Sequence, residues 1–194
     1  MTQWNLSVAV RCALLGYSRA LLGWRLGSHS RHGQEPNLTL QDPILDEPAG
    51  LFVTLRKHGE LRGCIGTVRT SDPLRATLRR VTVEAALEDP RFAPVTDDEL
   101  QLCVIEHSIL TVPHTVGELR DIRLGTEGII FSAVGKRALF LPEVPGEQGW
   151  DLSQTLSHLA RKAGLSADAW RSEAAHFEVF ETIHYSEEEC VNER

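Results

Sequence analysis

Aromatic residues, long apolar runs and motifs for nucleotide binding are scarce or missing in this sequence. Phe, Trp and Tyr make up 6% of its 194 residues, which disfavours the base-stacking platform of single-strand nucleic-acid binders. No apolar run reaches the roughly eighteen residues that a membrane-spanning helix needs. The net charge of -7 also disfavours a general nucleic-acid binder, because affinity for phosphate backbones comes mainly from clustered Lys and Arg.

The sequence has only four cysteines, which are widely spaced: Cys12, Cys64, Cys103 and Cys190. None forms a Cys-x-x-Cys pair, and a chain of this length builds a core that does not depend on disulfide bonds. Residues 1–5 lack the basic region of a signal peptide, and Arg11 interrupts the apolar stretch that follows. We therefore expect free thiols and a cytoplasmic location.

Neither a cofactor nor a metal ion is predicted. No Gly-x-Gly-x-x-Gly follows a predicted strand, and no Walker-type Lys-Ser/Thr is present. His29 and His32 are close in sequence, but no cysteine or aspartate constellation accompanies them. Cys64, His58 and His107 could meet in the fold, although nothing in their spacing requires it.

Hydrophobic periodicity predicts helices that alternate with β-hairpins. Helices are predicted over residues 5–26, 72–89 and 151–163. Strands are predicted over residues 51–56, 61–68, 102–110, 128–133, 137–141 and 177–185. We also expect a long proline-containing loop over residues 27–50 and a solvated acidic tail from residue 187 to residue 194. This order favours an α+β fold with a largely antiparallel sheet, and not a doubly wound nucleotide fold.

Cys64 is the first candidate for chemistry. It lies between Gly63 and Gly66, where missing side chains let backbone amides approach a ligand. Arg62 shares its face of a regular strand, and a neighbouring guanidinium favours the reactive thiolate form of a cysteine. The alternative is that Cys64 is a small buried apolar residue, because free cysteine is among the most buried residue types and no catalytic partner is fixed by spacing.

Glu106 and His107 are the second candidates. They are consecutive in the strand predicted over residues 102–110, so alternation places them on opposite faces of the sheet. A charged group within an apolar stripe needs a partner, and Arg62 is our candidate partner for Glu106. The alternative is a purely structural ion pair or a carboxylate at the sheet edge. Trp150, just before a predicted helix, either lines a cleft or covers the edge of the core.

The chain contains several short segments whose combination and order match those of a known protein family. They are Phe52-Val53-Thr54, Leu61-Arg62-Gly63-Cys64-Ile65-Gly66-Thr67, Asp89-Pro90-Arg91-Phe92, Pro94-Val95, Glu99-Leu100, Ser108-Ile109-Leu110-Thr111, Leu141-Pro142-Glu143-Val144, Gln148-Gly149-Trp150-Asp151 and Lys162-Ala163-Gly164-Leu165. Together they resemble the AMMECR family, also called protein A of the AmmeMemoRadiSam system. The resemblance spans residues 5–187, and the segment that contains Cys64 resembles the family's hallmark motif.

The resemblance implies one AMMECR-type domain over residues 1–194. Its fold would consist of two fused α/β lobes that share a curved, mainly antiparallel sheet covered by helices. The hallmark segment would lie near the cleft between the lobes, and we take Gly63, Ile65, Gly66 and Trp150 as candidate ligand-binding residues. The resemblance also implies an association with a Memo-like protein and a radical SAM protein, and it leaves the reaction unnamed.

Two functions follow from these patterns, and both stay open. In the first, the protein is an enzyme component in which Cys64 is a nucleophile or redox thiol, Arg62 activates it, and Glu106 or His107 is the base. In the second, the protein is a non-catalytic binding or scaffold module for a protein or a small ligand. A nucleic-acid role ranks third, and no membrane partner is expected.

Overall fold

The computed structural model describes residues 6–27 and 33–191 of the chain. Its helices are α1 (Val8–Leu26), α2 (Leu74–Leu87), α3 (Asp97–Leu100), α4 (Glu143–Gln148), α5 (Leu152–Lys162) and α6 (Glu187–Val191). Its strands are β1 (Gly50–Lys57), β2 (Glu60–Thr67), β3 (Cys103–Leu110), β4 (His114–Thr115), β5 (Glu127–Ala133), β6 (Lys136–Phe140) and β7 (His176–Ser186). Short 3-10 helices lie at Pro43–Asp46, Leu119–Asp121 and Ala169–Arg171.

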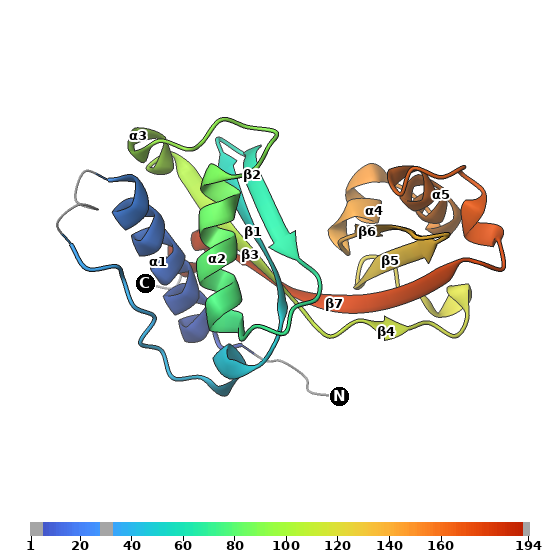
Figure 1. The fold of residues 1–194 in the computed structure, drawn as a ribbon, viewed down its shortest axis with the longest axis horizontal. Coiled ribbons are helices and arrows are strands. Elements are labelled where there is room, and N and C mark those ends of the chain that lie inside the picture. The colour runs from blue at the N-terminus through green and yellow to red at the C-terminus, as the bar shows by residue number, and fades with distance from the viewer. Residues whose placement is uncertain (1–5, 28–32, 192–194) are drawn as a thin grey trace. The chain divides into compact units, whose positions relative to one another are not determined.

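The strands run in the order β2-β1-β3-β7-β5-β6, and β4 pairs with β7 (Figure 1). The pairs β1–β2, β4–β7, β5–β6 and β5–β7 are antiparallel. The chain divides into two compact units, residues 1–109 with 183–194 and residues 110–182, and β7 contributes residues to both. This architecture confirms the predicted α+β class with a mainly antiparallel sheet.

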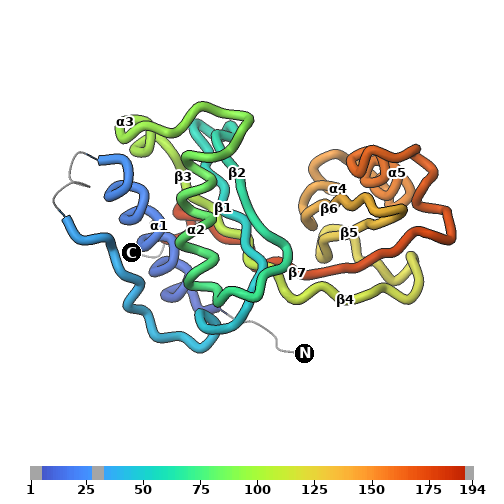
Figure 2. The backbone as a smooth tube through the Cα atoms, viewed as in Figure 1, coloured from blue at the N-terminus to red at the C-terminus, as the bar shows by residue number. Residues whose placement is uncertain are grey.

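In the first unit, α1 and α2 cover one face of the strands β1 to β3 (Figure 2). Alternation along β1 explains why this face is apolar, because Leu51, Val53 and Leu55 are all fully buried beneath the helices. The residues between them point to the other face and stay half-buried. A binding or reaction site on the face of the sheet opposite to the helices would therefore be formed by side chains outside the core.

The second unit has its own core. Strands β5 and β7 present Ile129, Phe131 and Val179 to α5, which contributes Leu156 and Leu159. The start of α5 is fixed by a capping box, in which the Asp151 carboxylate accepts the Gln154 amide hydrogen at 2.7 Å and the Gln154 side chain accepts the Asp151 amide hydrogen at 3.0 Å.

Two helix boundaries differ from the prediction. Helix α1 is first described at Val8, after Ser7 caps it by accepting the Val10 amide hydrogen, whereas residue 5 lies outside the described residues. Helix α2 begins at Leu74 and is not capped by the Asp72 side chain. The predicted loop over residues 27–50 contains the 3-10 helix Pro43–Asp46, and residues 28–32 lie outside the described residues.

The predicted acidic tail is solvated at Glu188 and Glu189, which are exposed, but Glu187 is half-buried and has partners. Residues Glu187–Val191 form α6, and the Glu187 carboxylate accepts the backbone hydrogen of Ile105 at 2.8 Å. The same carboxylate forms an ion pair with Arg19 of α1. Strand β7 ends at Ser186, so the carboxylate of the next residue satisfies a β3 amide that the strand no longer reaches.

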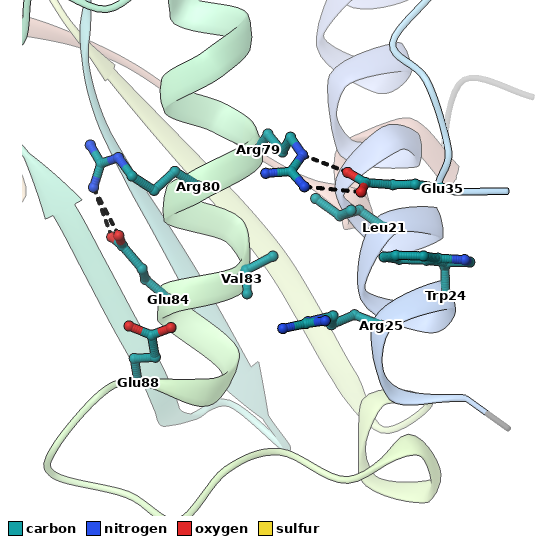
Figure 3. Close-up of a pocket in the computed structure, with 9 residues that line it drawn as sticks. All are labelled: Leu21, Trp24, Arg25, Glu35, Arg79, Arg80, Val83, Glu84 and Glu88. Atoms are coloured by element: carbon teal, nitrogen blue, oxygen red, sulfur yellow. Dashed lines mark hydrogen bonds and ion pairs between the residues drawn. The ribbon is translucent and has the colours of Figure 1, made fainter. Parts of the chain in front are cut away.

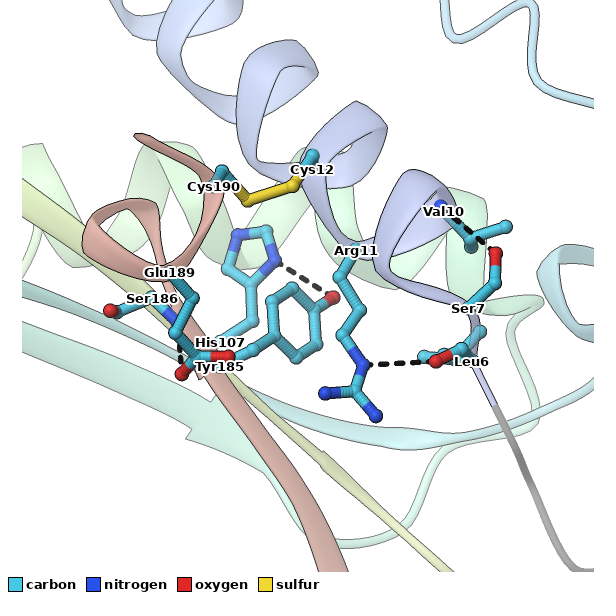
Figure 4. The surroundings of a disulfide bond; sticks show 10 residues. All are labelled: Leu6, Ser7, Val10, Arg11, Cys12, His107, Tyr185, Ser186, Glu189 and Cys190. Atoms are coloured by element: carbon cyan, nitrogen blue, oxygen red, sulfur yellow. Dashed lines mark hydrogen bonds between the residues drawn. A yellow bond between two sulfur atoms is a disulfide. The ribbon is translucent and has the colours of Figure 1, made fainter. Parts of the chain in front are cut away.

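The expectation that all four thiols are free is wrong. Cys12 of α1 and Cys190 of α6 form a disulfide bond, with their Cα atoms 5.6 Å apart (Figure 4). The two residues are 178 positions apart in the sequence. That separation hides the pairing from any spacing argument, because only the docking of α6 on α1 brings the sulfur atoms together.

Candidate functional site

The two glycines around Cys64 serve close packing. A Cβ atom at Gly63 would lie 2.2 Å from the Ala85 carbonyl oxygen, so β2 contacts the backbone of α2 at this point. A Cβ atom at Gly66 would lie 2.2 Å from the ring of Phe52, its cross-strand partner. Ile65 packs against the core of the first unit. The structure thus accounts for these residues by packing, and their predicted ligand-binding role stays a prediction.

Cys64 faces away from α2, because it follows Gly63 in the alternation of β2. Its backbone is held from both sides by one ion pair. The Cys64 amide donates to Asp89 Oδ2 at 2.9 Å, and Arg91 Nη2 donates to the Cys64 carbonyl oxygen at 3.1 Å. Arg91 and Asp89 also bind each other through two hydrogen bonds of 2.9 and 2.6 Å. The pair therefore fixes the position of the Cys64 backbone.

The two members of this pair differ in exposure. The Asp89 side chain is 3% exposed, whereas the Arg91 side chain is 53% exposed. The hydrogen bonds from Arg91 lower the pKa of Asp89 far below its usual range against the opposing effect of burial, and the backbone amides of Cys64 and Arg91 lower it further. Asp89 is thus a permanent buried anion that positions a half-exposed cation.

The sulfur of Cys64 is half-buried and accepts a hydrogen bond from Thr54 Oγ1 at 3.2 Å. The pKa of Arg91 is raised, chiefly by its hydrogen bonds to Asp89, with smaller contributions from the charge of Asp89 and from the Cys64 side chain. Arg91 is therefore the cation that contacts Cys64, through the hydrogen bond to its carbonyl oxygen. The sequence suggested Arg62 for this position.

Arg62 instead forms an ion pair with Glu99 of α3. Its Nε and Nη2 atoms donate to the two Glu99 oxygens at 2.9 Å each, and Nη2 also donates to the Ala93 carbonyl oxygen. Lys57 shares the same carboxylate at 2.9 Å. Arg62 and, to a lesser degree, Lys57 lower the pKa of Glu99 to about 2. The guanidinium carbons of Arg62 and Arg91 both lie over the Phe92 ring, at 5.8 and 5.5 Å from its centroid.

The predicted pair between Arg62 and Glu106 is wrong. Glu106 pairs with Arg56, whose Nε donates to both carboxylate oxygens at 3.0 and 3.1 Å. The reason is a bulge in the hairpin: Leu55 pairs with Gly63 but Arg56 pairs with Leu61, so Arg62 has no cross-strand partner. A bulge interrupts the alternation of a strand and redirects the extra side chain.

The structure does not bring His107 together with Cys64. His107 is fully buried on the face of β3 that α1 covers, where its Nε2 lies 3.0 Å from Ser18 Oγ and its Nδ1 lies 3.1 Å from the Tyr185 hydroxyl (Figure 4). Burial, with a smaller effect from the charge of His184, lowers the pKa of His107 to about 3. His107 is therefore a neutral core residue in a polar chain that continues from Ser18 to Thr82.

Trp150 belongs to the second unit. Its ring stacks on His158 of α5 with the centroids 3.9 Å apart and the planes 4° apart, and it also contacts Phe140 of β6. Trp150 thus packs on α5 and on Phe140, which borders the core of the second unit, as one of the two alternatives from the sequence has it. The other alternative, a ligand-binding role, stays a prediction.

Comparison with known proteins gives the family. The sequence model of the AMMECR1 family matches residues 24–185. The chain belongs to the AMMECR1 family. Its relatives include protein MJ0810 of Methanocaldococcus jannaschii, which is 40% identical over 154 residues and covers 75% of this chain and 77% of its own length. A protein of Methanosarcina acetivorans is 34% identical over 198 residues, which cover all of this chain and 96% of the relative.

A solved structure of the same type supports this assignment. The crystal structure of uncharacterized protein PH0010 from Pyrococcus horikoshii has a TM-score of 0.78 and 31% sequence identity to this AMMECR1 protein, with 89% of each chain covered. The match extends over most of both chains. It shows that the α+β architecture described above also occurs in this solved protein.

Sequence reasoning missed the residues that hold the AMMECR1 hallmark segment in place. Asp89, Arg91, Phe92 and Glu99 are not among the candidate site residues that the sequence suggested. A signal was present, because Asp89-Pro90-Arg91-Phe92 and Glu99-Leu100 are among the segments that resemble the family. What the sequence lacked was the contact between this turn and β2, which lies 25 residues earlier in the chain.

A hollow in this AMMECR1 protein, of about 330 Å³, lies between α1 and α2 (Figure 3). Three arginines and three glutamates line it over an apolar floor that includes Leu21. Arg79 is paired with Glu35, and Arg80 is paired with Glu84. Because the charges balance and most are paired, the hollow favours no class of ligand.

Among the described residues, no three His, Cys, Asp or Glu side chains are grouped so that they could hold a metal ion. His29 and His32 lie outside the described residues. Within the same described part of the chain, no helix is long and apolar enough to span a membrane.

Proposed function

We propose that this AMMECR1-family protein binds an anionic group, a carboxylate or a phosphate, at the surface formed by Cys64, Arg91 and Phe92, which we call the Cys64–Arg91 site. The observation that supports the proposal is the state of Arg91. Its Nε and Nη2 atoms are held by Asp89 and by the Cys64 carbonyl oxygen, while half of the side chain is exposed. A guanidinium has five donors, so the exposed edge can still bind an acceptor.

Preorganisation strengthens this proposal. A ligand that meets a side chain already fixed in place does not bear the entropic cost of ordering it. Arg91 is fixed by a buried carboxylate and by the backbone of Cys64, which pairs with Thr54 of β1. The surroundings also favour an anion, because Lys57 and Arg62 share the single carboxylate of Glu99.

Acid–base catalysis has less support from the geometry. Of the two bases that the sequence suggested, His107 is buried on the opposite face of β3 and Glu106 is paired with Arg56. The Asp89 carboxylate is too weak a base to accept a proton near neutral pH, because its pKa is strongly lowered. Anion binding, in contrast, needs only a guanidinium that is held in place and half-exposed, as Arg91 is.

A second candidate function rests on the hydrogen bond that Thr54 donates to the sulfur of Cys64. Thr54 and Arg91 thus place two hydrogen-bond donors around Cys64, one at its sulfur and one at its carbonyl oxygen. In this second proposal the bound anion is a substrate for the Cys64 thiol, and the protein acts as an enzyme component beside Memo-like and radical SAM proteins in a modification pathway of the cytoplasm.

Alkylation of Cys64 by two small reagents tests the binding proposal. Iodoacetate and iodoacetamide react with a thiol in the same way, by displacement of iodide, but only iodoacetate carries a carboxylate. If Arg91 holds anions beside the sulfur, the ratio of the iodoacetate rate to the iodoacetamide rate at Cys64 exceeds that of free cysteine, and it falls to the free-cysteine value in Arg91→Gln. Mass spectrometry under non-reducing conditions identifies the alkylated residue.

Arg80→Gln is the matched control, because Arg80 lies on α2 and is paired with Glu84 rather than with the hallmark segment. It leaves the ratio unchanged if the effect belongs to Arg91. An equal ratio in wild type, Arg91→Gln and free cysteine rejects anion binding at this site. Cys64→Ser separates the two candidates in the cell, since a binding module keeps its function without the thiol, whereas an enzyme component that uses the thiol loses it.

A further inference from the structure

The disulfide between Cys12 and Cys190 lies at the edge of the core of the first unit. Both residues are half-buried rather than fully buried. The two free cysteines are Cys64, on the outer face of β2, and Cys103, which is buried and donates from Sγ to the Glu99 carbonyl oxygen. Burial raises the pKa of Cys103 and makes it a poor participant in exchange.

The disulfide joins α1 to a helix with few other anchors. Helix α6 has five residues, and a helix of that length is not stable without tertiary contacts. Its anchor besides the disulfide is Glu187, which binds Arg19 and the Ile105 amide.

The Glu187 anchor extends into the first unit. Arg19 binds Glu187 and also donates to the Leu100 and Cys103 carbonyl oxygens at 2.7 and 2.6 Å. These carbonyls lie at the end of α3 and the start of β3. Displacement of α6 would therefore leave a β3 amide without its acceptor and Arg19 without its carboxylate.

We propose that Cys12 and Cys190 form a reversible redox site that latches α6 onto α1 and β3. A dithiol reductant opens the latch by exchange: its thiolate attacks one sulfur of the bond, and the other sulfur leaves as a thiolate that takes up a proton. The second thiol of the reductant then attacks the reductant's own sulfur in the mixed disulfide and releases the second cysteine as a thiol. The products are two cysteine thiols on the protein and one oxidised reductant, and a disulfide oxidant reverses both steps.

Hydrogen exchange of the whole chain, with and without dithiothreitol, tests this proposal. In the oxidised protein the amides of α6 and of Ile105 are protected. After reduction, they exchange faster by roughly tenfold or more, while the amides of β1 keep their rates, because only a local segment is released. Cys190→Ser behaves like the reduced wild type whether or not dithiothreitol is present.

Three results would overturn the latch. The first is that no peptide linking Cys12 to Cys190 forms when the protein is equilibrated with oxidised glutathione. The second is that Ile105 and α6 exchange at the same rates in both redox states. The third is that reduction accelerates exchange in β1 as well, since the disulfide is then a staple for the whole unit. If Cys190→Ser does not fold, the reduced wild type still decides the question.

Discussion

The carboxylate of Asp89 accepts the backbone hydrogen of Cys64 at 2.9 Å, and through this bond a turn after α2 positions the hallmark strand. Asp89 also holds Arg91, whose guanidinium binds the carbonyl oxygen of the same cysteine. One buried acid thus sets the position of both the thiol and the cation beside it.

Asp89→Asn tests this arrangement through stability. The variant loses charge-assisted hydrogen bonds and leaves Arg91 without its partner, but Arg91 is half-exposed and remains partly hydrated. We expect the free energy of unfolding to fall by about 1.5–3 kcal/mol, measured by urea denaturation. Asp46→Asn is the control, since its side chain is 70% exposed in an ion pair with Arg75, and it should change stability by less than about 1 kcal/mol. Equal losses in both variants would contradict the account.

Gly63→Ala tests the close contact between β2 and α2. The added methyl group meets the Ala85 carbonyl oxygen, a backbone atom that cannot move without displacing the helix. We expect a loss of about 1–3 kcal/mol in the free energy of unfolding. Gly16→Ala in α1 meets no atom within 4 Å and should stabilise the protein by about 0.5–1 kcal/mol. A stable Gly63→Ala variant would show that β2 and α2 are farther apart than described.

His107 predicts a specific pH dependence. Its pKa is lowered from 6.5 to about 3 in the folded state, so unfolding takes up a proton between these values. Its contribution to stability is therefore complete above pH 6.5 and is lost as the pH falls toward 3. Between pH 6 and 4.5 we expect it to lower the free energy of unfolding by about 1.4 kcal/mol per pH unit. Denaturation at several pH values should show this slope in wild type and a reduced slope in His107→Gln; parallel curves would exclude the assignment.

Glu99 affects the pH dependence of stability at lower pH than His107 does. Its pKa is lowered from 4.5 to about 2, chiefly by Arg62, so its contribution is complete above pH 4.5 and is lost as the pH falls toward 2. In Glu99→Gln, we expect Arg62 to lose its fixed position and stability to vary less with pH between 4.5 and 2. Thermal unfolding of both proteins at pH 3 and at pH 6 measures this pH dependence. A wild-type difference between the two pH values that persists unchanged in the variant would contradict them.

The fold was largely predictable from local patterns. The alternation of Leu51, Val53 and Leu55 marks the buried face of β1, and the same rule placed Glu106 and His107 on opposite faces of β3. The capping sequence at Asp151 marks the start of α5. These features depend on neighbours within a few residues, which a sequence displays directly.

The partners at the site were not predictable in the same way. Arg62 was assigned to Glu106 on the assumption of a regular strand, and a single bulge redirected it to Glu99. The contact between Asp89 and Cys64 and the disulfide between Cys12 and Cys190 join segments that only the tertiary fold brings together. The shared order of family segments pointed to the right residues but not to their contacts.

The most direct measurement of the central claim is an NMR titration of the Arg91 side chain. The Nε–Hε resonance of Arg91 is assigned by comparison with Arg91→Lys and followed as inorganic phosphate, and separately acetate, is added at constant ionic strength. The account predicts a saturable shift of this resonance, with the resonance of Arg80 unchanged. A resonance of Arg91 that stays fixed, or that moves only in proportion with all other arginines, would contradict the claim that the Cys64–Arg91 site binds anions.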